Sequence, residues 1–495
     1  MRPDPGPEAN VGSWLALHAS TRPEHTALVV ERTGERISYR ELEARVRRTA
    51  AALRELGLAP GDRIALALPS EPLYLELYFA AALLGAISIP LNTRLTAAEL
   101  GFQLDDAEPR LAIRPTDSHL PARTGTRALS PEELRRQVAA SADFPERPPA
   151  PGGESPQTIL YTSGTTGQPK GALLPHRKTY WNTRNAELYF ELDSSSVAVC
   201  PIPLFHSFGL KILSVPALYC GATLVLVERF DPLGLQDCVA SHRATLLGAV
   251  PVMYARMLEA GLAAKKLESL RFAFSAGAPI AAETIERYFA QGVCLKQGYG
   301  QTETSILCCL DAADARRKAG SVGKPVPFGE IRIADESGRV VAPGQNGEVQ
   351  VRGPIVMLGY WRRPEETAAS RVGGWHRTGD LGVVDAEGFV TLVGRSKELY
   401  ISGGENVYPA EVERVLGQHP DVSEVAVVGV PDARWGESGR AYVVPARAPF
   451  DPDELLAWAG QRLARYKLPR EVVLVKELPR TASGKVQKHV LVAQR

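Results

Sequence analysis

The sequence predicts an α/β protein with more than one domain. Helical and β-type stretches alternate over residues 11–145 and again over residues 194–310, as they do in parallel βαβ units. Short alternating segments with glycine-rich turns over residues 320–393 indicate a β-rich region, and the tail that follows has an α+β pattern. A chain of 495 residues is also longer than one ordinary domain, so at least two domains are expected.

The first predicted elements alternate in type. Tyr39–Leu56 is predicted as an amphipathic helix that stops at Gly57, because glycine suits the backbone just beyond a helix. An apolar strand at Arg63–Leu68, a mostly apolar helix at Tyr74–Leu84 and a second strand at Ala86–Pro90 follow. This order predicts that the two strands pair in parallel.

Later strands are predicted from short apolar or alternating runs that end at turn residues. A polar segment rich in proline and glycine, residues 143–156, is predicted as a linker. The predicted strands are residues 157–160, 222–227, 244–250, 331–333, 348–351 and 389–392.

Composition narrows the classes of function. The content of 44% hydrophobic and 23% charged residues is typical of globular proteins, and a net charge of +1 gives no electrostatic reason to expect nucleic acid as a partner. The N-terminus lacks the apolar core of a signal peptide, and no segment is apolar over the length that spans a bilayer. The six cysteines lack metal-ligand or CxxC spacing, so we expect reduced thiols in a cytoplasmic protein.

One stretch, Tyr161–Gly171, has the residue types needed to bind a polyphosphate. Its glycines let backbone N–H groups turn toward an anion, its hydroxyls add neutral donors, and its lysine adds a point charge. It is not a Walker A loop, because Pro169 precedes the lysine and Gly171 follows it. The candidate phosphate-binding residues are Thr162, Ser163, Gly164, Thr165, Thr166, Gly167 and Lys170.

This run resembles the phosphate-binding motif of the adenylate-forming superfamily, which contains acyl-CoA synthetases, adenylation domains of nonribosomal peptide synthetases and luciferases. Further matching motifs occur in family order from Trp14 to Val490. The resemblance implies an N-terminal AMP-binding domain at residues 1–394, a hinge at residues 395–397 that contains Lys397, and a small mobile α+β domain at residues 398–495.

The resemblance also assigns a nucleotide site to the motif Gln297–Thr304. It implies that Tyr299 stacks on adenine and that Thr302 contacts the α-phosphate. It further implies that Glu303 holds Mg²⁺, with Thr165 as a second residue of the metal site. Small residues of this motif and of residues 274–279 are expected to let the adenine approach the backbone: Ala276, Gly277, Ala278, Gly298 and Gly300.

Residues near the C-terminus complete the assignment by resemblance. The resemblance implies that Asp380 accepts hydrogen bonds from the ribose hydroxyls. It also implies that Arg395 contacts the ribose. Lys485 is similar to the lysine that bridges the acid carboxylate and the α-phosphate, where a cation offsets the repulsion between two anions. The loop expected to border the pantetheine tunnel contains Ser402, Gly403 and Gly404.

An acyl pocket is expected beside His206. The superfamily carries an aromatic residue there, often histidine, that lines and gates the carboxylate pocket, and Phe205, Ala276 and Gly300 are expected to line it too. Lys211 lies in an otherwise apolar run. Either its side chain extends to the surface, or it meets a polar group on the distal part of the acid, because a buried charge needs a partner.

The resemblance therefore implies an ATP-dependent acid–CoA ligase that works by domain alternation. A carboxylate and ATP would give acyl-AMP and pyrophosphate with Mg²⁺, and the CoA thiol would then take the acyl group. The expected acid is a medium- or long-chain fatty acid or a bulky aryl or terpenoid acid. Two alternatives are an enzyme that loads an acyl carrier protein, disfavoured because no carrier segment precedes Arg495, and an inactive nucleotide-binding regulator. Monomer and homodimer are both open.

Overall fold

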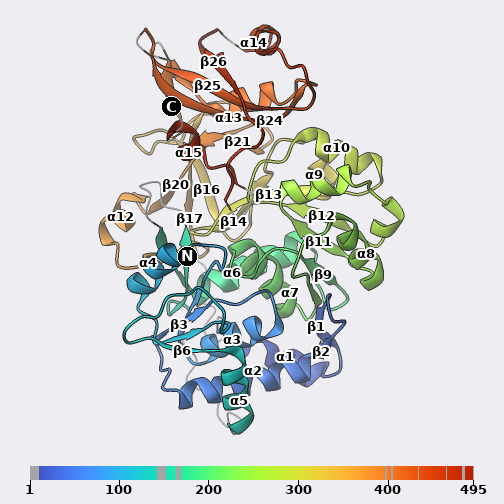
Figure 1. Cartoon of the computed structure of the whole chain (residues 1–495), viewed down its shortest axis with the longest axis vertical. Coiled ribbons are helices and arrows are strands. Elements are labelled where there is room, and N and C mark those ends of the chain that lie inside the picture. Colours follow the sequence, from blue (N-terminus) through green and yellow to red (C-terminus); the bar gives the residue numbers. More distant parts are fainter. Residues whose placement is uncertain are drawn as a thin grey trace. The chain divides into compact units, whose positions relative to one another are not determined.

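The computed structural model describes residues 10–141, 152–162, 169–395, 398–402, 405–432, 434–463, 465–481 and 485–493. The chain divides into two compact units, which Figure 1 shows coloured along the sequence. The first unit comprises Met1–Glu330 and Val351–His376, and the second comprises Ile331–Gln350 and Arg377–Arg495.

A nine-stranded sheet forms one layer of the first unit. Its central strands pair in parallel, and antiparallel strands are added at both edges. The order is β15 (Lys324–Pro325), β14 (Ser305–Cys309), β13 (Leu295–Gln301), β12 (Phe272–Ser275), β11 (Leu246–Ala249), β9 (Val197–Cys200), β10 (Thr223–Leu226), β1 (Thr26–Val30) and β2 (Arg36–Ser38).

A seven-stranded sheet forms the other layer. Its strands β3, β4, β5, β6 and β7 pair in parallel, as the alternation in the sequence predicts, and β7 turns back into β8 as an antiparallel hairpin. The order is β18 (Gly359–Tyr360), β8 (Lys170–Pro175), β7 (Pro156–Thr162), β4 (Ile87–Pro90), β3 (Arg63–Leu66), β5 (Leu111–Ile113) and β6 (Arg127–Leu129).

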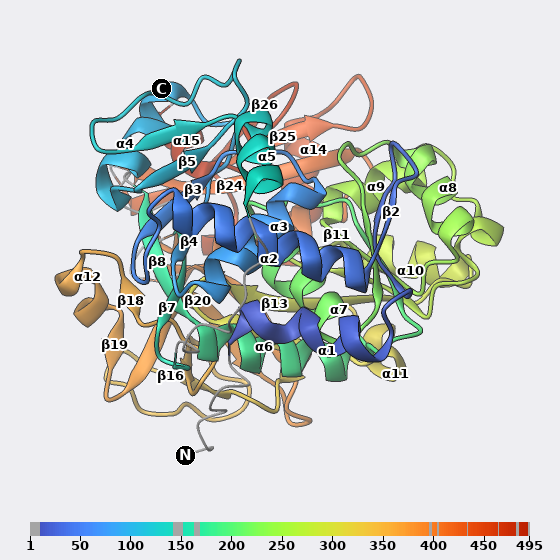
Figure 2. The ribbon, with the colours of Figure 1, turned by 90° about the horizontal axis from the view of Figure 1, so that it is seen from below.

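Helices of the first unit pack against both sheets. Helix α2 (Tyr39–Glu55) contacts β1 and β2, whereas α3 (Pro72–Leu83) contacts β3 and β4. Figure 2 shows α1 (Trp14–Thr21), α2 and α3 side by side. Every residue of α3 from Leu73 to Leu83 is buried, as expected for a helix that is apolar on all sides.

The sequence explains where these helices begin and end. Ser38 and Glu41 form a capping box at the start of α2, and Gly57 follows its end with φ +87°. The remaining helices of the unit are α4 (Ala97–Ala107), α5 (Pro131–Ala140), α6 (His176–Tyr189), α7 (Val215–Tyr219), α8 (Pro232–His242), α9 (Pro251–Glu259), α10 (Ala282–Ala290), α11 (Ala312–Ala315) and α12 (Pro364–Ala369).

Most residues of two smaller sheets belong to the second unit, and these sheets lie among the orange and red segments of Figure 1. The first has the order β16 (Glu330–Ala334), β17 (Gly347–Arg352), β20 (Trp375–Val384) and β19 (Arg371–Val372), with β21 (Val390–Arg395) paired to β20. The second has the order β23 (Glu405–Val407), β22 (Tyr400–Ser402), β25 (Gly436–Pro445) and β24 (Val422–Asp432), with β26 (Glu471–Leu474) paired to β25.

Three helices accompany the second of these sheets: α13 (Pro409–Leu416), α14 (Pro452–Gly460) and α15 (Lys488–Ala493). Val412 of α13 and Leu455 of α14 share a buried apolar cluster with Val427 of β24. The burial of these side chains is the main driving force for folding of this part of the chain.

The predicted α/β class and the predicted elements are confirmed, each within a few residues of its predicted ends. The domain limits at residues 394 and 398 stay predictions, and the hinge residue Lys397 lies outside the described residues. Across the described residues, none of the helices is both long enough and apolar enough to cross a lipid bilayer.

Candidate active site

Strand β13 and the turn between β13 and β14 carry one of the two strong nucleotide motifs predicted from the sequence. Tyr299 is in β13 and is 8% exposed, whereas Thr302 and Glu303 lie in the turn and are half-buried. Gly300 has no room for a side chain, because a Cβ there would lie 2.0 Å from the backbone oxygen of Ser305. The glycine is therefore required by the tight pairing of β13 with β14.

Glu303 is held by residues from two distant segments. Its Oε1 accepts hydrogen bonds from Thr162 Oγ1 (3.3 Å) and from the Tyr360 hydroxyl (3.2 Å), and its backbone oxygen accepts from Met357 N (2.8 Å). Burial and the nearby Glu303 carboxylate raise the pKa of Tyr360. Tyr360 therefore stays a protonated donor that fixes the carboxylate.

These side chains fit a Mg²⁺ ion that also takes oxygens from a triphosphate. Mg²⁺ prefers oxygen ligands and few carboxylates when phosphates are present, and Glu303 with the Thr162 hydroxyl supplies that chemistry. The Thr304 hydroxyl is fully buried and lacks a hydrogen-bond partner among the described residues. No cluster of three or more His, Cys, Asp or Glu side chains occurs among the described residues, so the fit depends on the nucleotide's own oxygens.

The predicted phosphate loop connects β7 to β8, which pair antiparallel. Thr162 and Lys170 end the two strands and pair directly in register. Lys170 Nζ lies 3.9 Å from Glu366 Oε1 and 5.5 Å from the centre of the Tyr360 ring. The predicted residues Ser163, Gly164, Thr165, Thr166 and Gly167, including the predicted metal contact of Thr165, lie outside the described residues.

The segment expected beside adenine follows β12. Ser275 Oγ is buried and has no hydrogen-bond partner among the described residues. Gly277 has φ +90°, a conformation that favours glycine, and Gly277 and Ala278 are exposed while Ala276 is half-buried. Gly298 is needed for packing, because a Cβ there would lie 2.7 Å from the Phe274 ring.

His206 lies just before a π-helix, Phe208–Ser214, a rare form that is common at functional sites. Its ring centre is 4.5 Å from that of Phe205, and its Nε2 has no hydrogen-bond partner among the described residues. Burial, aided by Arg94, lowers the pKa of His206 to about 4. The imidazole is therefore neutral at pH 7, as suits the wall of a largely apolar pocket.

The predicted extension of Lys211 to the surface is wrong. Lys211 is 4% exposed, and its Nζ donates to Gln157 Oε1 (2.5 Å), Thr158 Oγ1 (2.9 Å) and Thr179 Oγ1 (3.0 Å). It also lies 4.9 Å from the centre of the Tyr78 ring. These acceptors belong to β7 and α6, so the apolar residues next to Lys211 in the sequence gave no indication of them. Its contact with the acid stays a prediction.

Three of the predicted residues come together within the second unit. Asp380 in β20 and Arg395 in β21 are direct neighbours in register, and Arg395 Nε lies 3.0 Å from Asp380 Oδ1. Burial is the main cause that lowers the pKa of Lys485, with a further decrease from Arg395 and an opposing increase from Asp380 and Glu398. These three predicted residues thus bring one carboxylate and two cations together, and Glu398 and Lys488 also act on Lys485.

Backbone contacts hold the segment that carries Lys485. Its backbone N–H donates to Thr481 Oγ1 (3.2 Å), and its carbonyl accepts from Thr481 N (2.7 Å). Ser402 is 4% exposed and pairs with Gly436 at the end of β22. Gly403 and Gly404, the other residues predicted to border a CoA tunnel, lie outside the described residues.

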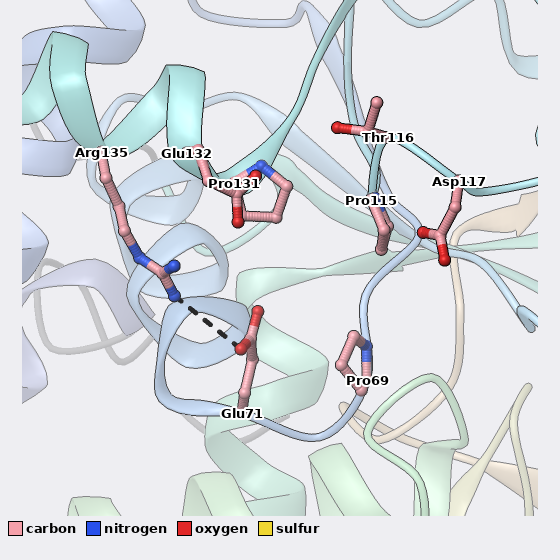
Figure 3. Close-up of a pocket in the computed structure, with 8 residues that line it drawn as sticks. All are labelled: Pro69, Glu71, Pro115, Thr116, Asp117, Pro131, Glu132 and Arg135. Atoms are coloured by element: carbon pink, nitrogen blue, oxygen red, sulfur yellow. Dashed lines mark ion pairs between the residues drawn. The ribbon is translucent and has the colours of Figure 1, made fainter.

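The surface hollow in Figure 3 is separate from these residues. It has a volume of about 530 Å³, and Glu71 and Arg135 pair across it with 3.8 Å between their charged atoms. Burial raises the pKa of Glu71. No residue that the sequence assigns to a site is among its described lining residues: Pro69, Glu71, Pro115, Thr116, Asp117, Pro131, Glu132 and Arg135.

The fold and the residues around Glu303 suit a nucleotide-dependent enzyme, and comparison with known proteins gives its family. The profile described as AMP-binding enzyme matches residues 15–361, and that of the AMP-binding enzyme C-terminal domain matches residues 411–485. The chain therefore belongs to the AMP-binding enzyme family, among the acyl-CoA synthetases of the adenylate-forming superfamily. Enzymes of this class use ATP, Mg²⁺ and CoA.

Two curated relatives match over nearly the whole chain. A feruloyl-CoA synthase from Amycolatopsis sp is 42% identical over 485 residues, which cover 97% of each chain. An indoleacetate–CoA ligase from Aromatoleum aromaticum is 40% identical over 495 residues, which cover 97% of this chain and 96% of the relative.

Solved structures of similar proteins have the same fold. The crystal structure of ATP-bound MatB from Rhodopseudomonas palustris matches with a TM-score of 0.93 and 35% identity, covering 98% of both chains. An o-succinylbenzoate CoA synthetase from Bacillus subtilis, solved with ATP and a magnesium ion, matches with a TM-score of 0.87 and 32% identity, covering 97% of this chain and 98% of the other.

Sequence reasoning missed Tyr360 and Met357, both of which donate a hydrogen bond to Glu303. Tyr360 binds the glutamate that the sequence did identify, but it lies 57 residues further along the chain. A Gly-Tyr-Trp sequence carries no signal for this role, because tyrosine and tryptophan are ordinary packing residues. Tyr360 pairs with Ala172 of β8, whose hairpin partner β7 carries Thr162, the other side-chain donor to Glu303.

Proposed function

We propose that this protein is an ATP-dependent aryl acid–CoA ligase. The carboxylate of an aromatic acid would attack the α-phosphate of ATP to give acyl-AMP and pyrophosphate, and the CoA thiol would then displace AMP. The observation that carries the proposal is the anchored glutamate: Glu303, fixed by Thr162 and Tyr360 at the base of the phosphate hairpin. This arrangement suits a metal-bound triphosphate.

Each residue would have a distinct role in adenylation. Glu303 would hold the Mg²⁺ ion, which neutralises phosphate charge when bound. Asp380, oriented by Arg395, would accept hydrogen bonds from the ribose hydroxyls. Lys485 would place a cation between the acid carboxylate and the α-phosphate, and the neutral His206 ring would close the acid side without adding charge.

Thiol transfer would need a different face of the second unit. Ser402 and the glycines that follow it would border the pantetheine arm once Lys485 has been withdrawn, so the unit would alternate between two orientations. CoA is the acceptor we propose, and an acyl carrier protein is the alternative. A cytoplasmic location also stays a prediction; it agrees with the six cysteines, all of them free in the structure.

The aromatic substrate class is supported by the named relatives. The two most similar relatives above are named for feruloyl and indoleacetate substrates, at 42% and 40% identity. A long-chain-fatty-acid–CoA ligase from Mycobacterium tuberculosis is less similar, at 35%. The aromatic ring of Phe205 beside the neutral His206 would suit an aryl group.

A panel of acids tests the proposal. Pyrophosphate release is measured with ATP, CoA and matched sets of arylpropenoic, arylacetic, fatty and terpenoid acids, and kcat/KM is expected to be highest for an aromatic acid. Highest kcat/KM with a fatty acid would overturn the substrate class. Tight ATP binding without turnover of any acid would instead favour an inactive regulator. Repeating the assay with pantetheine-bearing carrier proteins in place of CoA decides the acceptor.

A further inference from the structure

Helix α6 presents a buried polar stripe that the proposed mechanism does not use. Lys178, Asn182 and Asn185 recur at the spacing that places side chains on one face of a helix, and all three are buried. Asn182 Oδ1 accepts from Ile306 N (3.2 Å), and Asn185 Oδ1 accepts from Phe328 N (3.1 Å). Through these two bonds, the polar face of α6 holds β14 and the segment around Phe328, which lie far away in the sequence.

Lys178 is the charged member of this stripe. It is 3% exposed, and its Nζ donates to Ser305 Oγ at 2.5 Å. Burying an ammonium group is costly unless it is paired with an opposite charge and hydrogen-bonded. Burial is the main cause that lowers the pKa of Lys178 to about 7; the Glu303 carboxylate opposes this decrease, and Arg177 adds to it.

Ser305 is the strained end of the metal-site turn. Its φ of +65° lies in the left-handed region, which is unusual for a serine, and the β13–β14 register shifts just beside it. Ser305 pairs with Gln301 across the turn, and Thr304 N donates to Gln301 O (3.2 Å). Glu303 thus lies inside a tight turn whose last residue keeps its conformation only if its surroundings hold it.

We propose that Lys178 is a positioning residue for the metal–nucleotide site: through its bond to Ser305 it fixes the Gln301–Ser305 turn, so that Glu303 meets bound Mg²⁺–ATP in the correct geometry. Asn182 secures the following residue, Ile306, one helical turn further along α6. The inference rests on the proposed function, since it assigns Mg²⁺–ATP to this turn. Residues that orient metal ligands typically change metal affinity 10–100-fold when they are altered.

Direct binding of Mn²⁺ in place of Mg²⁺ tests the inference without turnover. Electron paramagnetic resonance measures free Mn²⁺ as it is titrated into the full-length protein with α,β-methylene-ATP. Lys178→Met and Ser305→Ala are each expected to raise the Kd for Mn²⁺ about tenfold. The double variant is expected to show the same shift as either single variant, because both remove one shared interaction.

A matched control variant distinguishes the loss of a positioning contact from the general effect of removing a buried lysine. Lys296 is also buried, at 2% exposed, but its Nζ donates to Tyr189 O (2.8 Å) and lies over the Phe272 ring. Lys296→Met is expected to change the free energy of unfolding without changing the Kd for Mn²⁺. Ser305→Asn is expected to recover part of the affinity, because asparagine tolerates positive φ and offers an acceptor to Lys178.

The outcomes are distinct. An unchanged Kd for Mn²⁺ in folded Lys178→Met, or in Ser305→Ala should the lysine variant not fold, would overturn the inference. So would an equal shift in Lys296→Met. If the wild-type protein binds Mn²⁺ with the nucleotide and the variants weaken it, but no acid is turned over, the positioning role stands and the proposed ligase function fails.

Discussion

At the scale of single residues, burial decides which side chains carry charge. His206 and Lys211 were both predicted to line the acyl pocket, and burial lowers the pKa of both. The sequence identified both positions, but it could not show their partners. The acceptors of Lys211 are in β7 and α6, and two of them, Gln157 and Thr158, precede it by more than 50 residues.

The pKa of His206 predicts a pH-dependent stability. Its folded-state pKa of about 4 is below the ordinary value of 6.5, so its contribution to stability is fully present above pH 6.5 and is lost as pH falls toward 4. His206→Phe removes this titration. The free energy of unfolding of the wild type is therefore expected to fall relative to that of the variant by about 3 kcal/mol between pH 7 and pH 4.

Urea denaturation of both proteins across that pH range checks the prediction. The difference between the two curves cancels the contribution of His376, whose pKa burial also lowers to about 4. Parallel curves for wild type and variant would show that His206 is solvated in the folded protein.

The contacts of Lys211 predict how it affects specificity. Its ammonium has three protein acceptors, so no polar group on the acid is needed to satisfy its three N–H donors. Lys211→Met is therefore expected to leave the ratio of kcat/KM values for polar and apolar aryl acids unchanged. A decrease in kcat/KM that is confined to acids with a distal polar group would show that Lys211 contacts the acid.

At the scale of elements, the strands and most helices could be predicted from the sequence. The irregular segments near the candidate site could be predicted only in part. Helix α2 was predicted at Tyr39–Leu56 and is observed at Tyr39–Glu55, because apolar periodicity and a capping box both mark it. The π-helix at Phe208–Ser214 was not predicted, since its sequence shows no departure from helical periodicity.

The long-range links at the candidate site were also hidden from sequence. Lys178 and Ser305 are 127 residues apart, and Thr162 and Glu303 are 141 apart. Motif resemblance could identify Glu303 by its local pattern. It gave no indication of Lys178, because a lysine in a polar helix is ordinarily a surface residue.

The β13–β14 turn predicts a stability effect at Gly300. A Cβ added there would lie 2.0 Å from Ser305 O, a rigid backbone atom, so Gly300→Ala must shift the strand pair. The expected cost is about 2–4 kcal/mol of unfolding free energy. Gly152→Ala is the matched control, because nothing lies within 4 Å of its added Cβ and its φ is not positive.

Chemical denaturation of the two glycine variants checks this expectation. Equal unfolding free energies for Gly300→Ala and Gly152→Ala would mean that the turn relaxes freely, and the account of the metal-site turn as a rigid element would then be wrong.

At the scale of the whole molecule, the residues predicted to bind the nucleotide fall into two sets, one in each compact unit. Glu303 and Tyr299 belong to the first unit, and Asp380, Arg395 and Lys485 belong to the second. The sequence predicted the α/β class and the order of motifs, because each motif is local. It could not show that Asp380, Arg395 and Lys485 come together, which depends on the pairing of β20 with β21.

The central claim is that Lys485 serves adenylation and not thiol transfer. The most direct test compares the two half-reactions of Lys485→Ala: acyl-AMP formation from acid and ATP, and thioester formation from pre-made acyl-AMP and CoA. Adenylation is expected to fall at least about 100-fold, because the cation between two anions is lost, while thioester formation stays near the wild-type rate. Adenylation at the wild-type rate in the variant would contradict the account.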